Sequence, residues 1–368
     1  MNLTSLTPSD PDRIGPFALR ARLGAGGMGV VYLGVSVAGE RVAVKVIRSG
    51  VLDDDQARAR FAREVEALKI VFGPRVSSLV DADPEAEEPW LAVEYVPGRT
   101  LKQHVAEHGP LPPELVAILG AALAEGLASI HKAGLLHRDL KPHNIMLGPD
   151  GPIVIDFGLA TLVERKQALT QTGMLIGTLL CMPPEQARGE KDLTAAADVY
   201  ALGATLLYAA TGHYPYDAAN PLALLQRITD ANHPPLLQDA PIQLAPLLAE
   251  MLSHDPEDRP ALDELTERLV HLVAEYGLTA EQARRRLIAA TAVKGDPTDD
   301  LVAADPAPDT REIPDDSVST PAPDPLTAPI TDAAGSGESR SGSPKPAPPA
   351  AARVAERLRM AYAREATF

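Results

Sequence analysis

The chain of 368 residues is 45% apolar, 4% aromatic and 23% charged, with a formal net charge of −16. This length and apolar content suit one large two-lobed domain, or two or three smaller domains, and exclude a chain that is disordered or fibrous throughout. The acidic excess argues against a protein that wraps nucleic acid, because neutralising phosphates requires a basic face. A single cysteine, Cys181, excludes a disulfide framework within the chain and argues against a cysteine-based zinc site.

Residues 1–13 are polar, contain two prolines and do not have the basic and then apolar layout of a secretory signal. We expect them to form a flexible N-terminus. The longest strongly apolar stretch, Val199 to Ala210, is too short to span a bilayer. Without a signal or a transmembrane segment, and with one cysteine, the sequence predicts a cytoplasmic protein.

The periodicity of apolar residues changes along the chain. Between Phe17 and Tyr95 we expect one helix, Asp53–Val71, among strands at Val30–Leu33, Arg41–Ile47 and Trp90–Tyr95. Beyond Pro110 we expect helices at Pro112–Ala133, Ala195–Thr211, Pro221–Asp230, Leu244–Ser253 and Leu262–Tyr276. A further helix should begin at Thr279, where Gln282 completes a capping-box pattern. The order predicts an α+β protein with a small β-rich lobe and a larger helical lobe, and ligands favour the crevice between such lobes.

Composition changes sharply after a helical extension that we expect at residues 277–294. Residues 295–350 contain 12 prolines, eleven acidic residues against three basic ones, and no aromatic residue. Such a segment buries too little apolar area to offset its ordering entropy, so we expect an acidic, Pro-rich disordered linker. In residues 351–368 apolar side chains recur every four residues among arginines, which favours a short basic amphipathic helix, with a frayed terminus as the alternative.

A glycine-rich motif is the first sign of chemistry, with Gly24, Gly26 and Gly29 in a G-x-G-x-x-G spacing. Alone the motif is weak, because dinucleotide-binding folds share it. In those folds the third glycine opens a helix, whereas here Val30 and Val31 continue as a strand. This favours a hairpin whose tip lets backbone amides approach phosphates, with an ordinary structural hairpin as the alternative.

The expected strand Arg41–Ile47 places Lys45 among apolar neighbours. Burying an ammonium group is costly unless it is paired, so Lys45 requires an anion. We select Glu64 from the following helical segment, because Phe61 and Val65 share its side of that helix. The alternative is a lysine at a strand edge whose ammonium group reaches solvent.

Two further segments, residues 137–147 and 153–158, decide between these alternatives. Asp139 is a carboxylate that can accept a hydroxyl proton. Asn144 and Asp156 supply oxygen ligands of the kind that Mg²⁺ prefers, together with phosphate oxygens and water. Chance does not account for these residue types in this order.

With these motifs, residues 14–276 resemble the catalytic domain of eukaryotic-like bacterial serine/threonine protein kinases, with an N-lobe at 14–95 and a C-lobe at 98–276. The resemblance implies transfer of the γ-phosphate of ATP, with Mg²⁺ or alternatively Mn²⁺, to serine and threonine hydroxyls of proteins, in signal transduction. The ATP-contacting residues that it implies are Leu23, Gly24, Gly26, Gly29, Val31, Ala43, Lys45 and, through the backbone, Glu94 and Val96. The implied metal ligands are Asn144 and Asp156.

The resemblance also assigns the catalytic roles. Lys45, paired with Glu64, holds the α- and β-phosphates, and Asp139 orients the substrate hydroxyl and takes its proton. Lys141 contacts the transferred phosphate in relatives specific for serine and threonine, and Thr178 bridges Asp139 and Lys141.

The segment after Asp156 is implied to be the activation segment. Thr170 and Thr172 lie where relatives autophosphorylate, and Arg138 is implied to receive the phosphate; ordinary loop threonines are the alternative. Cys181 is either a small packing residue or a redox switch.

Three more residues match structural positions of the family. Glu185 and Arg259 match a buried ion pair, and Asp198 matches the carboxylate that anchors the catalytic loop.

Two rival functions use the same residues. A pseudokinase or scaffold would present the tail to partners, and a small-molecule kinase would share the lobed fold. We expect protein substrates, no nucleic acid and a transient dimer for autophosphorylation, with the oligomeric state itself left open. Threonines of the tail, such as Thr320 and Thr331, would recruit phosphothreonine-binding modules unless they are simply solvated.

Overall fold

The computed structural model of the chain describes residues 3–27, 29–48, 50–52, 54–156, 179–293, 295–296, 298–299 and 301. By its contacts the chain divides into two units, residues 1–308 and 309–368, and every described residue belongs to the first. The expected helix at 351–368 and most of the expected linker lie outside the described residues. The same holds for Thr170, Thr172 and Thr178.

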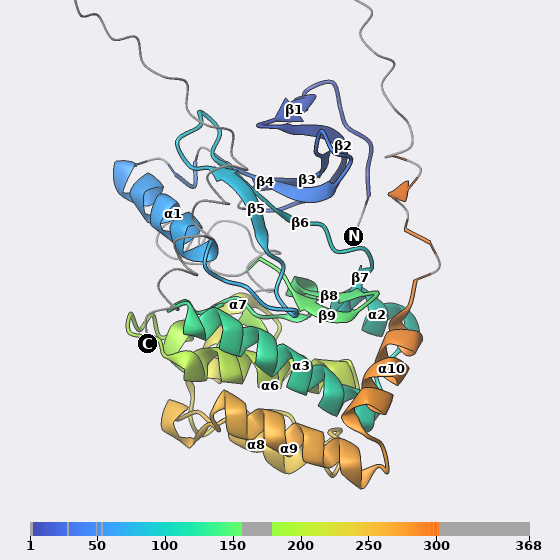
Figure 1. Cartoon of the computed structure of the whole chain (residues 1–368). Helices are drawn as coiled ribbons and strands as arrows, with labels where there is room; N and C mark the ends of the chain where they lie inside the picture. Colours follow the sequence, from blue (N-terminus) through green and yellow to red (C-terminus); the bar gives the residue numbers. More distant parts are fainter. Residues whose placement is uncertain are drawn as a thin grey trace, which may run out of the picture. The chain divides into compact units, whose positions relative to one another are not determined.

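Six antiparallel strands form one sheet in the spatial order β1-β2-β3-β4-β6-β5 (Figure 1). Their bounds are β1 Arg13–Ile14, β2 Phe17–Ala25, β3 Gly29–Val35, β4 Arg41–Ile47, β5 Leu79–Asp83 and β6 Trp90–Glu94. Buried and half-buried residues alternate along β2 from its first residue, the period-two pattern of a strand with one face in the core. The three expected strands are confirmed as β3, β4 and β6, with ends shifted by no more than two residues.

Helix α1 (Asp55–Leu68) lies beside this sheet (Figure 1). It begins where the side chain of Asp54 accepts a hydrogen bond from the amide of Ala57 at 2.6 Å, which satisfies one of the free amides of the first turn. Its buried face, with Phe61 and Val65, packs against Leu91 of the sheet. The expected helix is confirmed, and it is shorter at both ends.

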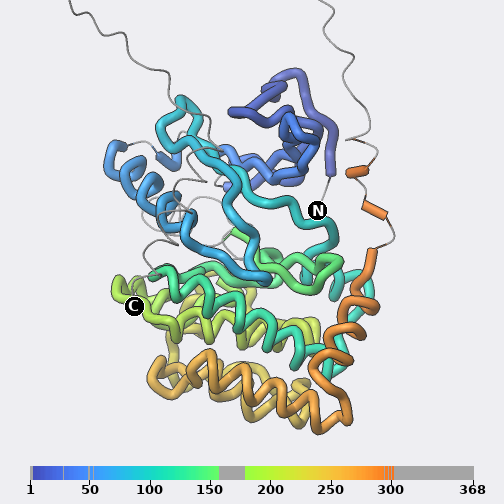
Figure 2. The backbone as a smooth tube through the Cα atoms, in the orientation of Figure 1, coloured from blue at the N-terminus to red at the C-terminus, as the bar shows by residue number. Residues whose placement is uncertain are grey.

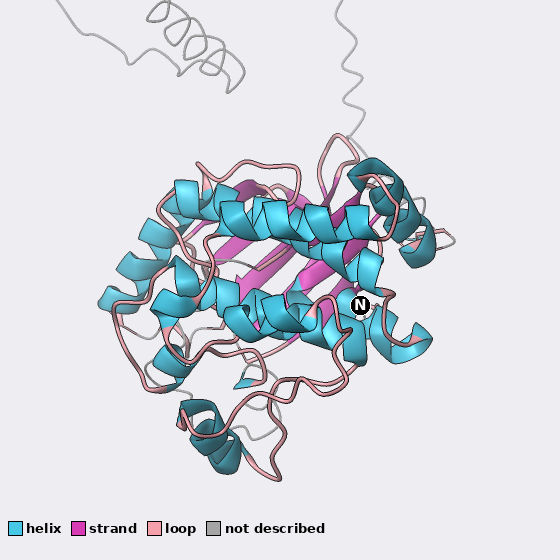
Figure 3. Ribbon diagram, turned by 90° about the horizontal axis from the view of Figure 1, so that it is seen from below, coloured by secondary structure: helices cyan, strands magenta, loops and turns pink. Residues whose placement is uncertain are grey.

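The helical part follows β7 (Arg99–Thr100). Its helices are α2 Leu101–His108, α3 Pro113–Lys132, α5 Pro184–Ala187, α6 Ala195–Thr211, α7 Pro221–Thr229, α8 Ala245–Met251, α9 Leu262–Glu275 and α10 Ala280–Thr291, with short 3₁₀ turns at Pro142–Asn144 and Pro256–Asp258. Figure 3 looks onto these helices from below, with the strands behind them. The five expected helices correspond to α3, α6, α7, α8 and α9.

Helix α3 is the centre of the helical core. It packs against α6, α9 and α10, and 12 of its 20 residues are buried. Of the described helices, α3 alone is long and apolar enough to cross a membrane on length and composition. Its burial among other helices identifies it as a core helix of this fold.

Two helices begin with a capping box. The expected box at Thr279 and Gln282 is confirmed at the start of α10. The second box joins Thr100 and Gln103, whose amide donates to the Thr100 hydroxyl at 3.1 Å, and it opens α2. Helix α2 is absent from the sequence-based expectations, although the same T-x-x-Q pattern marks its start.

A small sheet connects the two parts of the fold. Strands β7, β8 (Ile145–Gly148) and β9 (Gly151–Val154) form it, and Ile145 pairs with Val154 at one end. The pairing continues for one more bond, because the amide of Ile155 donates to the carbonyl of Asn144 at 2.9 Å. This bond places Asn144 next to Ile155, the residue before Asp156, at the open end of the hairpin.

The expectation of a flexible N-terminus is wrong for its described residues. The carboxylate of Asp10 is 2% exposed, binds Arg22 at 2.6 Å and accepts a hydrogen bond from the hydroxyl of Tyr32 at 2.7 Å. Thr4 pairs with Arg22 across the edge of the sheet. The guanidinium of Arg22 holds the pKa of Asp10 well below its usual range, despite its burial. This ion pair fixes a segment that composition alone describes as loose.

The chain also stays ordered beyond the expected start of the linker at Gly295. Asp296, Thr298, Asp299 and Leu301 contact the six-stranded sheet, and Thr298 is only 1% exposed. Figure 2 shows the orange tube continuing from α10 toward the blue N-terminal strands. Side-chain bonds to Arg41 and the packing of the single apolar residue Leu301 hold this acidic segment, so composition could not indicate it.

Candidate active site

The segment that carries Asp139 is anchored on a buried carboxylate. Asp198 of α6 is fully buried and accepts hydrogen bonds from the amides of His137 at 2.8 Å and Arg138 at 2.9 Å, and its Oδ2 lies 2.7 Å from Nε2 of His131. Arg138 has a left-handed backbone (φ 63°). Two hydrogen bonds hold it there, from its own amide to Asp198 and from the amide of Asp139 to Nδ1 of His137. The predicted anchoring role of Asp198 is therefore confirmed.

The pKa of Asp198 is held below its usual range. Burial by itself would raise it, but the hydrogen bond with His131 and the two amide bonds outweigh that effect. The carboxylate therefore stays charged and keeps both amides bound, which presents Asp139 to the site.

Two side chains, those of Lys141 and Asn144, contact Asp139. The ammonium of Lys141 lies 2.7 and 2.9 Å from its two carboxylate oxygens. The amide nitrogen of Asn144 donates to the carbonyl of Asp139 at 2.8 Å and to its carboxylate at 3.2 Å. A proton-accepting carboxylate next to a fixed cation is suited to align a hydroxyl and to stabilise negative charge close to it.

A second contact, made by Asp156, reaches the six-stranded sheet. Asp156 follows Ile155, has a left-handed backbone (φ 59°), and its carboxylate binds the ammonium of Lys45 at 3.1 Å. The side chain of Lys45 is 10% exposed, so a lysine that reaches solvent is excluded. The contacts thus form two groups, Lys45 with Asp156, and Asn144 and Lys141 with Asp139. The backbone bond from the amide of Ile155 to the carbonyl of Asn144 holds the two groups next to each other.

Glu64 lies on α1, half-buried beside the buried residues Phe61 and Val65. This position agrees with the helical face that the sequence predicts. Its pairing with Lys45 stays a prediction.

The glycine motif forms the hairpin between β2 and β3. Gly26 and Gly29 exchange backbone hydrogen bonds of 2.8 and 3.3 Å across its tip. A Cβ atom on Gly29 would lie 1.8 Å from the carbonyl oxygen of Val46, so packing alone requires this glycine. At Gly24 and Gly26, in contrast, no described heavy atom lies within 4 Å of the place of a Cβ. Packing does not explain these two glycines, whereas space for a phosphate group does.

Three of the apolar residues implied to contact ATP lie close together. Leu23 is buried in a cluster with Ala21, Leu33 and Tyr95, and Val31 and Ala43 pack against this cluster while staying partly exposed.

The backbone implied to contact ATP, at Glu94 and Val96, lies at the end of β6 and just after it. The carbonyl of Glu94 accepts a hydrogen bond from the hydroxyl of Ser77 at 3.1 Å, and a carbonyl oxygen has a second lone pair for a ligand. Val96 lies in the segment that leads from β6 to β7.

Asn144 and Asp156 fit a divalent cation in their donor chemistry. The nitrogen of Asn144 is used by Asp139, which leaves the amide oxygen as the free acceptor of that group, and Asp156 adds a carboxylate. The described residues contain no group of three or more His, Cys, Asp and Glu side chains that could hold a metal ion. A cation here would therefore need further oxygen ligands, such as phosphates and water.

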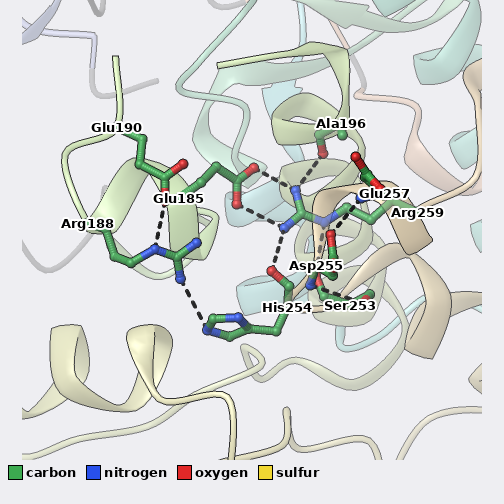
Figure 4. A network of polar contacts seen from close by, with 9 residues as sticks. All are labelled: Glu185, Arg188, Glu190, Ala196, Ser253, His254, Asp255, Glu257 and Arg259. Atoms are coloured by element: carbon green, nitrogen blue, oxygen red, sulfur yellow. Dashed lines mark hydrogen bonds and ion pairs between the residues drawn. The ribbon is translucent and has the colours of Figure 1, made fainter. Parts of the chain in front are cut away.

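The predicted ion pair between Glu185 and Arg259 is confirmed (Figure 4). The guanidinium binds both carboxylate oxygens, at 2.6 and 2.9 Å, and the two side chains are 5% exposed or less. Arg259 also donates to the carbonyls of Ala196 and Ser253, each at 2.9 Å. The pair thus ties α5 to the start of α6 and to the turn before α9.

Cys181 is buried, and burial raises the pKa of its thiol to about 12. A thiol with this pKa is protonated at neutral pH and reacts slowly. The packing role is therefore supported over the redox switch.

Two contributions to the site were missed from the sequence. His131 lies in the last turn of α3 and contacts Asp198. Its position near the end of a predicted helix is the only feature of the sequence that could have pointed to it. The second is the segment after α10, whose Leu301 packs against the same cluster as Val31 and Ala43.

Comparisons with known proteins agree with this geometry. A family model described as "Protein kinase domain" matches residues 17–270. The serine/threonine-protein kinase AfsK of Streptomyces coelicolor is 46% identical over 264 residues, which cover 72% of this chain and 33% of that protein. The probable serine/threonine-protein kinase PkwA of Thermomonospora curvata is 46% identical over 264 residues, which cover 72% of this chain and 35% of that protein.

The chain therefore spans about a third of the length of these two relatives. Among solved structures, the kinase domain of PknI from M. tuberculosis aligns with a TM-score of 0.56 and 28% identity. That alignment covers 72% of this chain and 97% of the PknI domain.

Proposed function

The chain belongs to the protein kinase domain family, and we propose that it is a protein serine/threonine kinase that transfers the γ-phosphate of ATP to serine and threonine hydroxyls of proteins. The observation that carries this proposal is the pair of Lys45 with Asp156 beside the group of Asp139, Lys141 and Asn144, with the Ile155–Asn144 backbone bond between them. An arrangement of this kind brings a phosphate-binding cation and a proton acceptor to one site, which phosphoryl transfer requires.

In the proposed mechanism each residue has one task. The hairpin with Gly24 and Gly26 covers the triphosphate, and Lys45 binds its α- and β-phosphates. Asp139 orients the substrate hydroxyl and accepts its proton, and Lys141 stabilises the charge on the transferred phosphoryl group.

Family membership implies ATP and a divalent metal ion, and we propose Mg²⁺, with Mn²⁺ as the alternative, held by Asn144 and Asp156. When bound, such an ion neutralises charge on the β- and γ-phosphates. The oxygen donors of these two side chains support this assignment, because Mg²⁺ prefers oxygen ligands and keeps several waters.

Two substitutions test the proposal in the full chain. We expect Lys45→Met and Asp139→Asn each to reduce phosphate transfer from labelled ATP to a generic basic protein by about 10²-fold or more, because a charge or a base at the reacting group is lost. Lys69→Met is the matched control, since Lys69 is an exposed lysine on the turn after α1. Circular dichroism checks that each variant is folded. Undiminished turnover in both folded variants would falsify the assignment.

We further propose that the enzyme autophosphorylates at Thr170 and Thr172, within a transient dimer. The added charges would gain charge-assisted bonds to Arg138. We expect mass spectrometry to find phosphate on one or both threonines after incubation of the full chain with ATP, and none in the Asp139→Asn variant. Full activity without phosphate on either residue would contradict this switch.

The same assay separates the rival functions. A scaffold without activity transfers no phosphate, and a small-molecule kinase does not label the basic protein. Labelling by the unmodified chain, lost in Asp139→Asn, supports a protein kinase over both. Recruitment of phosphothreonine-binding modules and the cytoplasmic location stay predictions.

A further inference from the structure

Four residues after α10 form a compact structure, which we name the C-terminal clasp: Asp296, Thr298, Asp299 and Leu301. The carboxylate of Asp296 accepts hydrogen bonds from the amide of Thr298 at 2.9 Å and from its hydroxyl at 2.8 Å. The amide of Asp299 donates to the carbonyl of Asp296 at 3.0 Å, and the amide of Leu301 to that of Thr298 at 3.2 Å. These local bonds give the clasp a single turn-like shape.

The clasp binds the start of β4 through Arg41. Nη1 of Arg41 lies 2.8 Å from Asp296, 2.9 Å from the Thr298 hydroxyl and 2.8 Å from Asp299. The side chain of Asp296 is 9% exposed and that of Arg41 is 31% exposed, so this contact is largely shielded from water. Charge-assisted bonds in such a position are stronger than those between exposed side chains.

The clasp also binds the segment that joins the two lobes. The hydroxyl of Tyr95 donates to Asp296 at 3.2 Å, and the guanidinium of Arg41 lies 5.6 Å from the centre of the Tyr95 ring. Burial raises the pKa of Tyr95 to about 12, so its hydroxyl keeps its proton at neutral pH. Leu301 completes the contact, since it packs on the cluster of Leu23 and Tyr95 that Val31 and Ala43 also touch.

The other end of this segment is fixed to the helical lobe. Helix α10, which leads into the clasp, packs against α3, α9, β8 and β9, and its residues Ala283 and Leu287 are buried. Arg284 of α10 and Arg75 both donate to the carbonyl of Asp150, at 3.0 and 2.8 Å. The chain therefore connects the lobes a second time, beside the direct connection through Tyr95 (Figure 1).

We propose that the C-terminal clasp is a positioning element for the nucleotide. By binding Arg41 and Tyr95 it fixes β4, which carries Ala43, and the backbone next to Glu94 and Val96. A second connection between the lobes restricts their relative motion before the nucleotide binds, so less ordering remains to be done on binding. The expected consequence is tighter ATP binding with little effect on the transfer step. This proposal rests on the proposed function, because it takes ATP as the ligand.

Single and double substitutions in the full chain test the clasp. We expect Asp296→Ala and Arg41→Ala each to raise the KM for ATP and the Kd of ATP measured by titration calorimetry about tenfold, with kcat changed less than about twofold. Because both remove the contact between Asp296 and Arg41, the double variant should lose less ATP affinity than the sum of the two single effects. Arg268→Ala is the matched control, since Arg268 pairs with Glu250 on the helical lobe at 35% exposure and should leave KM unchanged.

The outcomes separate this proposal from the proposed function. Unchanged ATP affinity in Asp296→Ala and Arg41→Ala overturns the proposal that the clasp positions the nucleotide. Lower thermal stability without a change in KM would show a merely structural role and overturns the proposal as well. Absence of phosphate transfer by the unmodified chain rejects the proposed function instead, and the calorimetric Kd then still tests the clasp.

Discussion

At the scale of single residues, the protonation state of the buried His137 matters for the segment before Asp139. His137 is fully buried, and burial lowers the pKa of its imidazole, although the charges of Asp198 and Asp139 act in the opposite direction. The neutral form is therefore favoured in the folded chain. In this neutral form Nδ1 of the ring can accept the hydrogen bond from the amide of Asp139, at 3.3 Å.

This lowered pKa predicts a pH dependence of stability. Below about pH 6.5, the ordinary value of histidine, the unfolded chain binds a proton that the folded chain resists, so stability falls as the pH falls. We expect the free energy of unfolding in urea to decrease by at most about 1 kcal/mol between pH 6.5 and 5.5 from this group, because the unfolded histidine is already half protonated at pH 6.5. In His137→Phe the slope over this interval should be flatter.

His271→Phe is the control for this experiment, because His271 is exposed on α9. It should keep the slope of the unmodified chain. The same slope in all three proteins would show that His137 does not resist protonation in the fold.

At the scale of elements, α5 illustrates a short helix held by one ion pair. With four residues it is too short to be stable on its own, so its position depends on Glu185 and Arg259. This ion pair is the most buried one among the described residues, and its Arg259 also binds backbone carbonyls. α5 follows the segment in which Thr170 and Thr172 lie, so the pair fixes the end of that segment.

Loss of this pair should be costly. We expect Arg259→Ala to lower the free energy of unfolding by about 3–5 kcal/mol, because the carboxylate of Glu185 stays buried without its cation. Arg188→Ala, which removes an exposed pair with Glu190 shown in the same network, should cost less than about 1 kcal/mol. Denaturation in urea measures both. The double variant Glu185→Ala with Arg259→Ala should recover part of the loss, and a cost in Arg259→Ala no larger than in Arg188→Ala would contradict this account.

At the scale of the whole molecule, two segments outside the expected domain complete the small lobe. The N-terminal residues add Asp10 beside Arg22, and the C-terminal clasp adds Asp296 beside Arg41. In both cases an acidic side chain from a polar segment neutralises an arginine of the sheet. The described fold therefore extends on both sides of the region 14–276 that the motifs mark.

The acidic residues thus set the net charge of the chain and, individually, also form ion pairs within the fold. A net charge of −16 favours basic partners over nucleic acid, whereas individual carboxylates within the same composition act as ties between distant parts of the chain. Asp296 and Arg41 are 255 residues apart in sequence and 2.8 Å apart in space.

The sequence by itself determined many of the described elements and predicted the candidate residues of the site. Strand and helix periods, the capping box at Thr279 and the spacing around Asp139 follow from local rules, because each depends on residues a few positions apart. The role of Asp198 in anchoring the segment before Asp139 could also be predicted, because Asp198 matches a family motif. Helix α2 was accessible too, through the pattern at Thr100, and was overlooked.

Only the tertiary structure decided which distant groups meet. Lys45 requires an anion on physical grounds, but the sequence cannot say that Asp156 is in contact with it, because many carboxylates satisfy the same requirement. The same holds for Asp10 and Asp296, whose segments have the composition of loose termini. Their order comes from pairing with arginines of a folded sheet, and a partner that exists only after folding leaves no periodic signal in the chain.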